Sequence, residues 1–555
     1  MSTSQPTSYR DIAQEIAQLA ADVDLRWPEQ PFVDRFGQSA RLDALLGEAR
    51  AAGQAVPRGA FHPRDALEAV LDWCGRATPR THLHEVACLL ACDELLVPGP
   101  TAARPADHVG FSREGYQTRA GARIIVYCHP RPAWRDQSPS PTPVEVMRPV
   151  MQSRLRALRY FVLDGGSRAR VDRLPELAEV EMQSLANAAS LRVGLFPLHG
   201  YHALFELVDE VQSHTLGTTV HGYRAHSIIH HGGTFRRFLR CGHPRDPRHY
   251  ESYIQQLRAV VDTARKLRID IIVLPELTVD GNGLQCLRER LRSAADTQHP
   301  SLIFAGSWHL DRNGRYVNEC AILGRDGYDI LRPQQKSNHY AFQPRRLFRG
   351  VLRRFAGRTF AAGISGADTV GAEWLSHWYA ENISLAATHQ IIPTPFGVFA
   401  VGICADVLPT ASTSPFAQVC ALPVDWLVVP SYNPVGDATD FMARAKDFAR
   451  TNGIFLYVNA DCTPASIIVR GLVSTVCDTT SGIGRGLVRA FHRILDLFRS
   501  PSPEAIVNFP RKQIWSSLTS GLRTPAIVDV RGEGIDGLVV DLRHPSLGGS
   551  DAPDR

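Results

Sequence analysis

The chain has 555 residues, of which 44% are hydrophobic and 21% are charged. These proportions are those of a globular protein, and they argue against a disordered, collagen-like or disulfide-scaffold protein. The formal net charge is only +5, which argues against a protein that binds nucleic acid through its overall charge, although a local basic patch stays open. At roughly 100–200 residues per domain, the length predicts two to four domains.

The basic residues and cysteines add two constraints. Only four of the 61 basic residues are lysines, namely Lys266, Lys336, Lys446 and Lys512. A retained lysine is therefore of interest, since arginine cannot replace an ammonium at a tight site. The eleven cysteines include no CxxC pair, and the chain shows neither a signal-peptide pattern nor a run of about 20 apolar residues. We expect a cytoplasmic protein with reduced thiols and no membrane span.

The first third of the chain is predicted to be mainly helical. Apolar residues recur at helical spacing at several places in residues 1–128, and a short strand-like run follows at 122–127. Residues 129–149 are rich in proline and are predicted to form a linker. Residues 150–190 are predicted to form a helical connector, and no family is recognised in residues 1–190.

After residue 190 the pattern changes to short apolar runs that alternate with helical stretches, which predicts an α/β fold. Several of these runs carry few charges, as strands covered on both faces do. The predicted strands are Leu191–Phe196, Asp270–Leu274, Leu302–Trp308, Asn318–Leu323, Gly397–Ile403, Trp426–Pro430 and Ile454–Asn459.

Three candidate functional residues lie at or close after strand ends. Glu276 follows an apolar strand in Leu-Pro-Glu, and Lys336 follows a predicted hairpin with an Asp-Gly turn. Cys404 ends the apolar run Gly-Val-Phe-Ala-Val-Gly-Ile-Cys. Taken singly, these residues are explained as a loop glutamate, a surface lysine and a small buried cysteine. Together they offer a nucleophile, a base for its proton and a cation for an oxyanion.

In this order, the three residues resemble the Glu–Lys–Cys triad of the carbon–nitrogen hydrolase (nitrilase/amidase) superfamily. The resemblance extends over residues 191–545. It is carried further by Leu191–Phe196, Ile303–Ser307, the hairpin from Asn318, Pro423–Ser431, Arg444–Ala460 and the closing strand Gly534–Leu542. It implies an α-β-β-α nitrilase-like sandwich for these residues, to which the apolar spacing adds an N-terminal mainly helical region.

The resemblance also implies the role of each residue. Cys404 would be the nucleophile, Glu276 the general base and Lys336 the group that stabilises the tetrahedral intermediate. The family often has a second glutamate between the lysine and the cysteine, and Glu381 is the candidate. The main chain of Ala405 is a candidate oxyanion donor. No cofactor is implied, and a histidine-rich stretch around Cys241 lacks the second ligand pair that a metal site needs.

The chain departs from the family in its insertions, which are predicted near residues 209–249, 340–375 and 485–525, with a flexible tail at 546–555. The second insertion includes Arg345–Arg358, which places apolar residues on one helical face. This segment is explained as a surface helix or as a contact for an acidic or nucleic-acid partner. Its arginines are Arg345, Arg346, Arg349, Arg353, Arg354 and Arg358.

The sequence therefore leads to two functional hypotheses. The first is a thiol hydrolase that cleaves a non-peptide C–N bond in a small-molecule amide or carbamoyl substrate, less readily a nitrile, and that forms a homo-oligomer as proteins of this fold commonly do. The alternative is a regulatory or effector protein, for example in bacterial antiviral defence, that uses the nitrilase-like domain for interaction or sensing.

Overall fold

The computed structural model divides the chain into two compact units. One comprises residues 1–167 with the short segments Thr394–Gly397 and Cys420–Pro423, and the other comprises the remaining residues. The structure describes residues 11–25, 37–55, 63–96, 111–112, 114–128, 155, 158–163, 168–186, 190–196, 198, 205–209, 217–219, 228–230, 236–241, 247–293, 299–313, 315–342, 379–381, 383–409, 414–432, 439–449, 454–459, 473–474, 526–532 and 535–543. The predicted linker 129–149, the insertion 485–525, the segment Arg345–Arg358 and the tail lie outside these residues.

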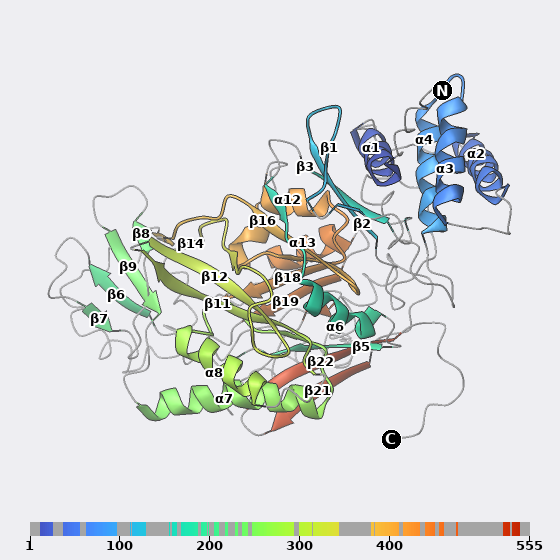
Figure 1. The fold of residues 1–555 in the computed structure, drawn as a ribbon. Coiled ribbons are helices and arrows are strands. Elements are labelled where there is room, and N and C mark those ends of the chain that lie inside the picture. Colours follow the sequence, from blue (N-terminus) through green and yellow to red (C-terminus); the bar gives the residue numbers. More distant parts are fainter. Residues whose placement is uncertain are drawn as a thin grey trace, which may run out of the picture. The chain divides into compact units, whose positions relative to one another are not determined.

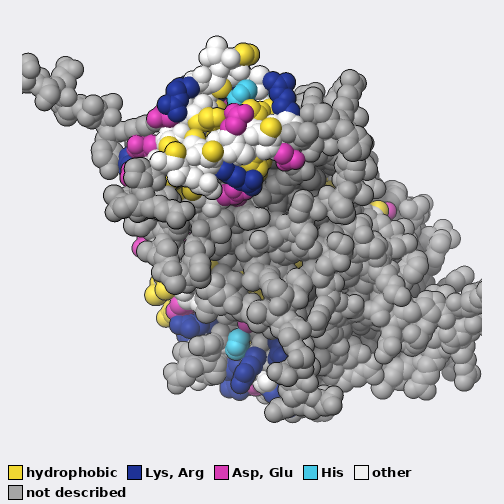
Figure 2. All heavy atoms as spheres, turned by 90° about the vertical axis from the view of Figure 1, so that its right-hand side faces the viewer, with side chains coloured by type: hydrophobic (Ala, Val, Ile, Leu, Met, Phe, Trp, Pro, Cys, Tyr) yellow, Lys and Arg dark blue, Asp and Glu magenta, His cyan; other side chains and the backbone are white. Residues whose placement is uncertain are grey.

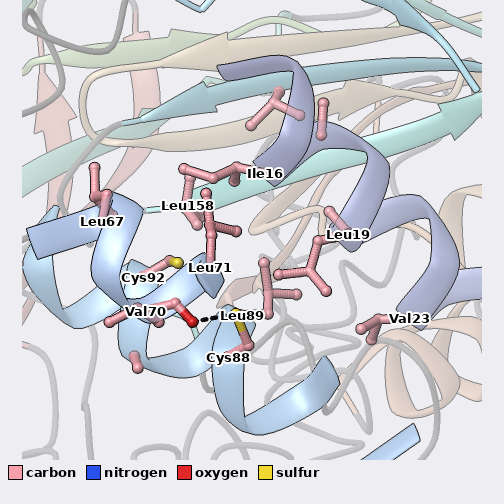
Figure 3. Close-up of a cluster of buried hydrophobic side chains, with 14 of the residues drawn as sticks. Ile16, Leu19, Val23, Leu67, Val70, Leu71, Cys88, Leu89, Cys92 and Leu158 are labelled. Carbon is pink, nitrogen blue, oxygen red and sulfur yellow. Dashed lines mark hydrogen bonds between the residues drawn. The ribbon is translucent and has the colours of Figure 1, made fainter. Parts of the chain in front are cut away.

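The first unit combines helices with a small sheet. The helices are α1 (Ile12–Leu25), α2 (Gly37–Gln54), α3 (Pro63–Arg76) and α4 (His82–Leu95). The antiparallel sheet has the order β1 (Tyr116–Gln117), β2 (Arg123–Cys128) and β3 (Leu158–Leu163). Apolar side chains of the helices and of β3 form one buried cluster, in which the Cys88 thiol donates to the Val70 carbonyl at 3.6 Å (Figure 3). The helical prediction for this region is thus confirmed for its described part.

Two buried carboxylates among the described residues of this unit have hydrogen-bond donors. Glu85 on α4 is 1% exposed and accepts from Arg80 at 3.1 Å, while Asp93 accepts the Leu158 amide of β3 at 2.6 Å. The Asp93 contact ties the sheet to the end of α4. On the described part of the outer face, acidic and basic side chains are interspersed with apolar ones (Figure 2).

The prediction of a helical connector over 150–190 is only partly right. Helix α6 spans Glu176–Ala186, but Leu158–Leu163 forms β3 and Ala169–Val171 forms β4. The run Leu-Arg-Tyr-Phe-Val-Leu of β3 is rich in aromatic and branched side chains, which favour a strand once a partner such as β2 is available. The spacing of apolar residues in so short a segment gives no information about the strand with which it pairs.

The second unit contains a seven-stranded mixed sheet that is built on three parallel apolar strands. These are β5 (Ser190–Leu195), β10 (Ile271–Val273) and β11 (Leu302–Arg312). β12 (Arg315–Gly324) and β13 (Gln334–Gln335) extend the sheet beyond β11. On the other side β22 (Ile535–Arg543) and β21 (Ala526–Gly532) follow β5. The closing strand expected at Gly534–Leu542 is therefore confirmed as β22.

The other large sheet of this unit has six strands, again with a parallel centre. Its order is β20 (Val473–Ser474), β19 (Ile454–Asn459), β18 (Trp426–Ser431), β17 (Gly397–Val401), β16 (His389–Thr394) and β4. Every residue of β16 to β19 is buried, which explains why β17, β18 and β19 have largely continuous rather than alternating apolar sequences.

The two sheets face each other and carry helices on their outer sides (Figure 1). Phe304 of β11 packs on Phe399 of β17 with ring centroids 5.5 Å apart. Helices α7 (Pro247–Lys266) and α8 (Gly281–Arg292) bury their apolar residues against β10 and β11. Helix α13 (Thr439–Ala449) packs on β19, and α12 (Pro415–Cys420) precedes β18. The α/β class and the α-β-β-α sandwich are thus confirmed.

A third sheet joins two of the predicted insertions. β6 (Phe205–Asp209), β7 (Gly217–Thr219), β8 (Ile228–His230) and β9 (Arg236–Cys241) come from the first insertion and its edge. β8 pairs with β15 (Tyr379–Glu381), which pairs with β14 (Ala341–Phe342), and all pairings in this sheet are antiparallel. Two segments that the sequence predicts as separate insertions therefore contribute to one sheet. No helix in the described residues is both long enough and apolar enough for a membrane span.

Gly306 allows β11 to approach the end of β10 from which Glu276 follows. Its φ is +69°, and an added Cβ would lie 2.2 Å from the Pro275 carbonyl oxygen. We expect Gly306→Ala to lower the free energy of unfolding by about 2 kcal/mol or more, because the strained backbone and the clash add. Thermal unfolding measures this effect. Gly281→Ala, where a Cβ meets nothing within 4 Å, is the control, and equal midpoints for the two variants would contradict the argument.

Candidate functional site

The structure brings Glu276, Lys336 and Cys404 together from three segments. Glu276 lies three residues beyond β10, Lys336 directly follows β13, and Cys404 lies just beyond β17 at the start of the 3₁₀ helix η4 (Cys404–Val407). Their exposed fractions are only 2%, 1% and 2%. Glu276 and Lys336 come from the seven-stranded sheet and Cys404 from the six-stranded sheet, so the site is formed at the carboxyl ends of strands of both layers.

The Glu276 carboxylate is held by three donors. Lys336 Nζ donates to Oε1 at 2.7 Å, and Asn318 Nδ2 donates to the same oxygen at 2.8 Å. The backbone amide of Tyr432 donates to Oε2 at 2.9 Å. A buried carboxylate needs such partners because it has lost its water shell. The three bonds also fix the orientation of the carboxylate.

The peptide unit of Tyr432 links the glutamate to the cysteine. Its N–H contacts Glu276, and its carbonyl accepts the Cys404 thiol at a sulfur–oxygen distance of 3.7 Å. The neighbouring Ser431 hydroxyl donates to Cys404 Sγ at 3.2 Å. Both residues lie at the end of β18, which pairs in parallel with β17. The pairing of these two strands thus places a donor and an acceptor beside the sulfur.

Strained backbone marks both sides of the site. Cys404 has φ +48° and Leu277, the residue after Glu276, has φ +54°. Residues other than glycine rarely adopt this left-handed region, which costs about 1–3 kcal/mol and is concentrated at active sites. The sharp turn at Cys404 lets the side chain leave the strand end and reach Ser431 and Tyr432.

The Cys404 thiol is protonated at neutral pH. Burial raises its pKa, and the negative charge of Glu276 raises it further, whereas the Lys336 ammonium and the hydrogen bond from Ser431 lower it. The net direction is upward. A sulfur in this environment becomes a nucleophile only if a base takes its proton during the reaction.

Lys336 is positioned by its own main chain. Its amide donates to the Asn318 carbonyl at 2.7 Å, and its carbonyl accepts from Ala386 at 2.9 Å. Asn318 therefore contacts Glu276 through its side chain and Lys336 through its backbone. Because β12 carries Asn318 and pairs with β13, the strand register itself sets the spacing of the two charged groups.

Sequence reasoning missed four contributors, namely Asn318, Asp406, Ser431 and the main chain of Tyr432. Asn318 stood in a segment that was assigned only to the hairpin. Asp406 lies two residues after Cys404, and the sequence alone indicates no role for it. Ser431 ended a recognised strand motif. The residues that these four contact lie 27 to 156 positions away along the chain, so no local sequence pattern identifies the contacts. The exception is the short-range contact between Asp406 and Ile403.

Two further predicted residues are placed with less detail. The backbone of Glu381 lies in β15 and pairs with Ile228 of the third sheet, and its side chain lies outside the described residues. Ala405 is buried in η4 directly after Cys404, and its carbonyl accepts from Asn338 Nδ2 at 3.0 Å. Within the part of the chain that the structure describes, no group of three or more His, Cys, Asp or Glu is arranged to hold a metal ion.

Comparison with known proteins gives matches only among solved structures. No family model matches the sequence, and no curated protein does. A glutamine-dependent NAD+ synthetase from Acinetobacter baumannii is 17% identical over 49% of this chain, with a TM-score of 0.26, and the match spans 38% of the synthetase. A variant of a nitrilase-superfamily amidase from Nesterenkonia sp. AN1 is 14% identical over 56% of this chain and 98% of its own, with a TM-score of 0.26. A CN-hydrolase superfamily protein from Xanthomonas campestris is 14% identical over 49% of this chain and 77% of its own, also at 0.26.

His389 gives the site a pH-dependent contribution to stability. It is 3% exposed, its Nε2 lies 2.7 Å from Ser337 Oγ, and burial lowers its pKa to about 4. Between that value and its ordinary pKa near 6.5, the unfolded chain binds the proton more tightly, so this contribution is present above about pH 6.5 and is lost as the pH falls towards 4. We expect wild type to lose unfolding free energy relative to His389→Gln over this range, by up to about 1.4 kcal/mol per pH unit.

Chemical denaturation of both proteins at several pH values between 7.5 and 4.5 measures this difference. Because Asp406 is present in both proteins, its own titration cancels in the comparison. Two stability curves that stay parallel would show that His389 does not titrate as described.

Proposed function

We propose that the protein is a thiol hydrolase of the carbon–nitrogen hydrolase superfamily, which cleaves a non-peptide C–N bond through a cysteine thioester. The observation that carries the proposal is the buried Glu276–Lys336 contact of 2.7 Å, held beside a cysteine at a strained strand end. The resemblance of the sequence favours an amide or a carbamoyl group over a nitrile as the substrate.

The first half of the reaction forms the thioester. Glu276 takes the proton of the Cys404 thiol while the sulfur attacks the carbonyl carbon. The carbonyl π electrons move to oxygen and produce a tetrahedral oxyanion. The Lys336 ammonium stabilises this charge, and a backbone N–H of η4, with Ala405 as the candidate, is the second donor.

The second half releases the products. The protonated Glu276 gives its proton to the leaving nitrogen as the C–N bond breaks, which leaves a thioester on Cys404. Glu276 then takes a proton from water, whose oxygen attacks the thioester carbon. Collapse of the second tetrahedral intermediate breaks the C–S bond, and the proton on Glu276 returns to sulfur. The free acid leaves and the thiol is restored.

The activation of Cys404 is tested with Glu276→Gln. The amide keeps the shape of the side chain but cannot take a proton, so we expect chloroacetamide alkylation of Cys404 to slow at least tenfold. Cys320, which is 0% exposed and lies on β12, is the reference thiol in the same sample, and its rate should not change. Peptide mass spectrometry against pH follows both cysteines.

The same variants are then assayed for ammonia release from a panel of primary amides and N-carbamoyl compounds. Glu276→Gln should lower turnover by 10²-fold or more, and Cys404→Ser should lower it at least as far. If Cys404 reacted like Cys320 in wild type and were indifferent to Glu276→Gln, the catalytic role of Cys404 would be disproved.

Lys336 provides a second test that rests on the shape of a side chain rather than its charge. The residue is 1% exposed, so the larger planar guanidinium of Lys336→Arg cannot occupy the space of the ammonium. We expect at least a 10²-fold loss of kcat/KM, although the charge is conserved. Lys266→Arg, at the exposed end of α7, is the control and should behave as wild type. Near-normal activity of Lys336→Arg would argue against a precisely placed oxyanion group.

A further inference from the structure

We propose that Asp406 is a positioning residue of this site, whose carboxylate holds the loop that carries Lys336 against the turn that carries Cys404. The inference rests on the function proposed above and assigns a task to a residue outside the Glu–Lys–Cys set. In this role Asp406 touches neither the substrate nor the reacting atoms, and it acts by keeping the lysine and the sulfur at a fixed separation.

The carboxylate of Asp406 binds both segments at once. Its Oδ1 accepts the backbone amides of Ser337 at 2.9 Å and Asn338 at 2.8 Å, the two residues directly after Lys336. Its Oδ2 accepts the amide of Ile403, the residue directly before Cys404, at 2.9 Å. One oxygen thus serves the lysine loop and the other serves the cysteine turn, which come from different sheets of the sandwich.

Other contacts reinforce the same junction. Asn338 Nδ2 donates to the carbonyl of Ala405 at 3.0 Å, so the loop also binds the turn on the other side of Cys404. Ser337 Oγ lies 2.7 Å from His389 Nε2, and His389 Nδ1 lies 3.4 Å from the Val401 carbonyl near the end of β17. Among these contacts, Asp406 supplies the charged acceptor, and charge-assisted hydrogen bonds are about twice as strong as neutral ones.

Opposing effects act on the pKa of the Asp406 carboxyl group. The residue is fully buried, and burial raises its pKa to about 6, while the Lys336 ammonium and the bonds from Ile403 and Ser337 act in the opposite direction. Among the described residues, other titratable groups near the junction include Glu276, the Cys404 thiol, His339 and His389, the last of which is neutral above pH 5. Above about pH 6 the carboxylate is ionised and accepts all three amides. Protonation turns one oxygen into a donor and removes an acceptor.

The test compares Asp406→Asn with Asp425→Asn. Asp425 is also a buried carboxylate, at 2% exposed, and its Oδ2 accepts the Val398 amide at 2.8 Å. It lies at the opposite end of β17 from Cys404, so its variant reports the general effect of neutralising a buried aspartate in this sheet. In Asp406→Asn the amide nitrogen must face one of the N–H donors, which forces the loop and the turn apart.

Two readouts separate positioning from folding. At pH 7.5 we expect Asp406→Asn to slow Cys404 alkylation at least tenfold, and turnover by up to about 10²-fold, at a thermal midpoint no lower than that of Asp425→Asn. The ratio of wild-type to Asp406→Asn alkylation rates should grow as the pH rises from 5 to 7, because only wild type gains the ionised carboxylate. The corresponding ratio for Asp425→Asn should stay constant.

Equal effects of the two substitutions, or a pH-independent ratio for Asp406→Asn, would overturn the proposal. If Asp406→Asn does not fold, Asn338→Ala replaces it, because it removes only the side-chain bond to Ala405. Asn338→Ala should also slow Cys404 alkylation, by a smaller factor than Asp406→Asn. If Cys404 of Asn338→Ala were alkylated at the wild-type rate, the proposal would again be overturned. If Cys404 is alkylated slowly in Glu276→Gln but at the wild-type rate in Asp406→Asn, only the positioning role is refuted. An unaffected Cys404 in Glu276→Gln refutes the proposed function.

Discussion

The site depends on a buried ion pair between Glu276 and Lys336, whose atoms lie 2.7 Å apart. Removing both charges from water is unfavourable, and the attraction between them offsets this only if the remaining hydrogen-bonding capacity is also satisfied. For Glu276 the Asn318 side chain and the Tyr432 amide do so. The pair therefore requires β12 and β18, one strand from each of the two sheets, to be in place around it.

This requirement constrains the order and register of the strands near the site more tightly than the structure elsewhere in the unit. The order of parallel strands brings Glu276, Lys336, Cys404 and Tyr432 to one end of the two layers, and a shift of register in either sheet would leave a buried charge without a donor. The third sheet, by contrast, is made largely from segments that the sequence predicts as insertions. It adds structure without altering the strand order on which the charges depend.

The parts of the molecule that the sequence predicted are those that leave a local signal. Continuous apolar runs predicted the buried strands β10, β17 and β18, and the order of three strand-end residues predicted which side chains meet. Asn318 and Asp406 escaped because a hydrogen bond to a residue 42 or 69 positions away has no periodicity. β3 was expected to be helical because its strand character depends on pairing with β2. In both cases, the site residues and the strand β3, the structure depends on partners far away in the sequence rather than on local propensities.

The resting protonation state follows from the same charges. Besides the ammonium of Lys336, the surroundings of the sulfur contain the carboxylate of Glu276 and, behind the turn, that of Asp406. A permanent thiolate would be a buried negative charge beside the Glu276 carboxylate, and the pKa of the Cys404 thiol is raised by that burial first and by Glu276 second. Transfer of the proton to Glu276 avoids this pair of negative charges, because the total charge stays the same while the negative charge moves to the sulfur. In the proposed function, a glutamate in contact with the lysine is thus suited to take the cysteine's proton during the attack, and its bond to Lys336 holds it in position for that step.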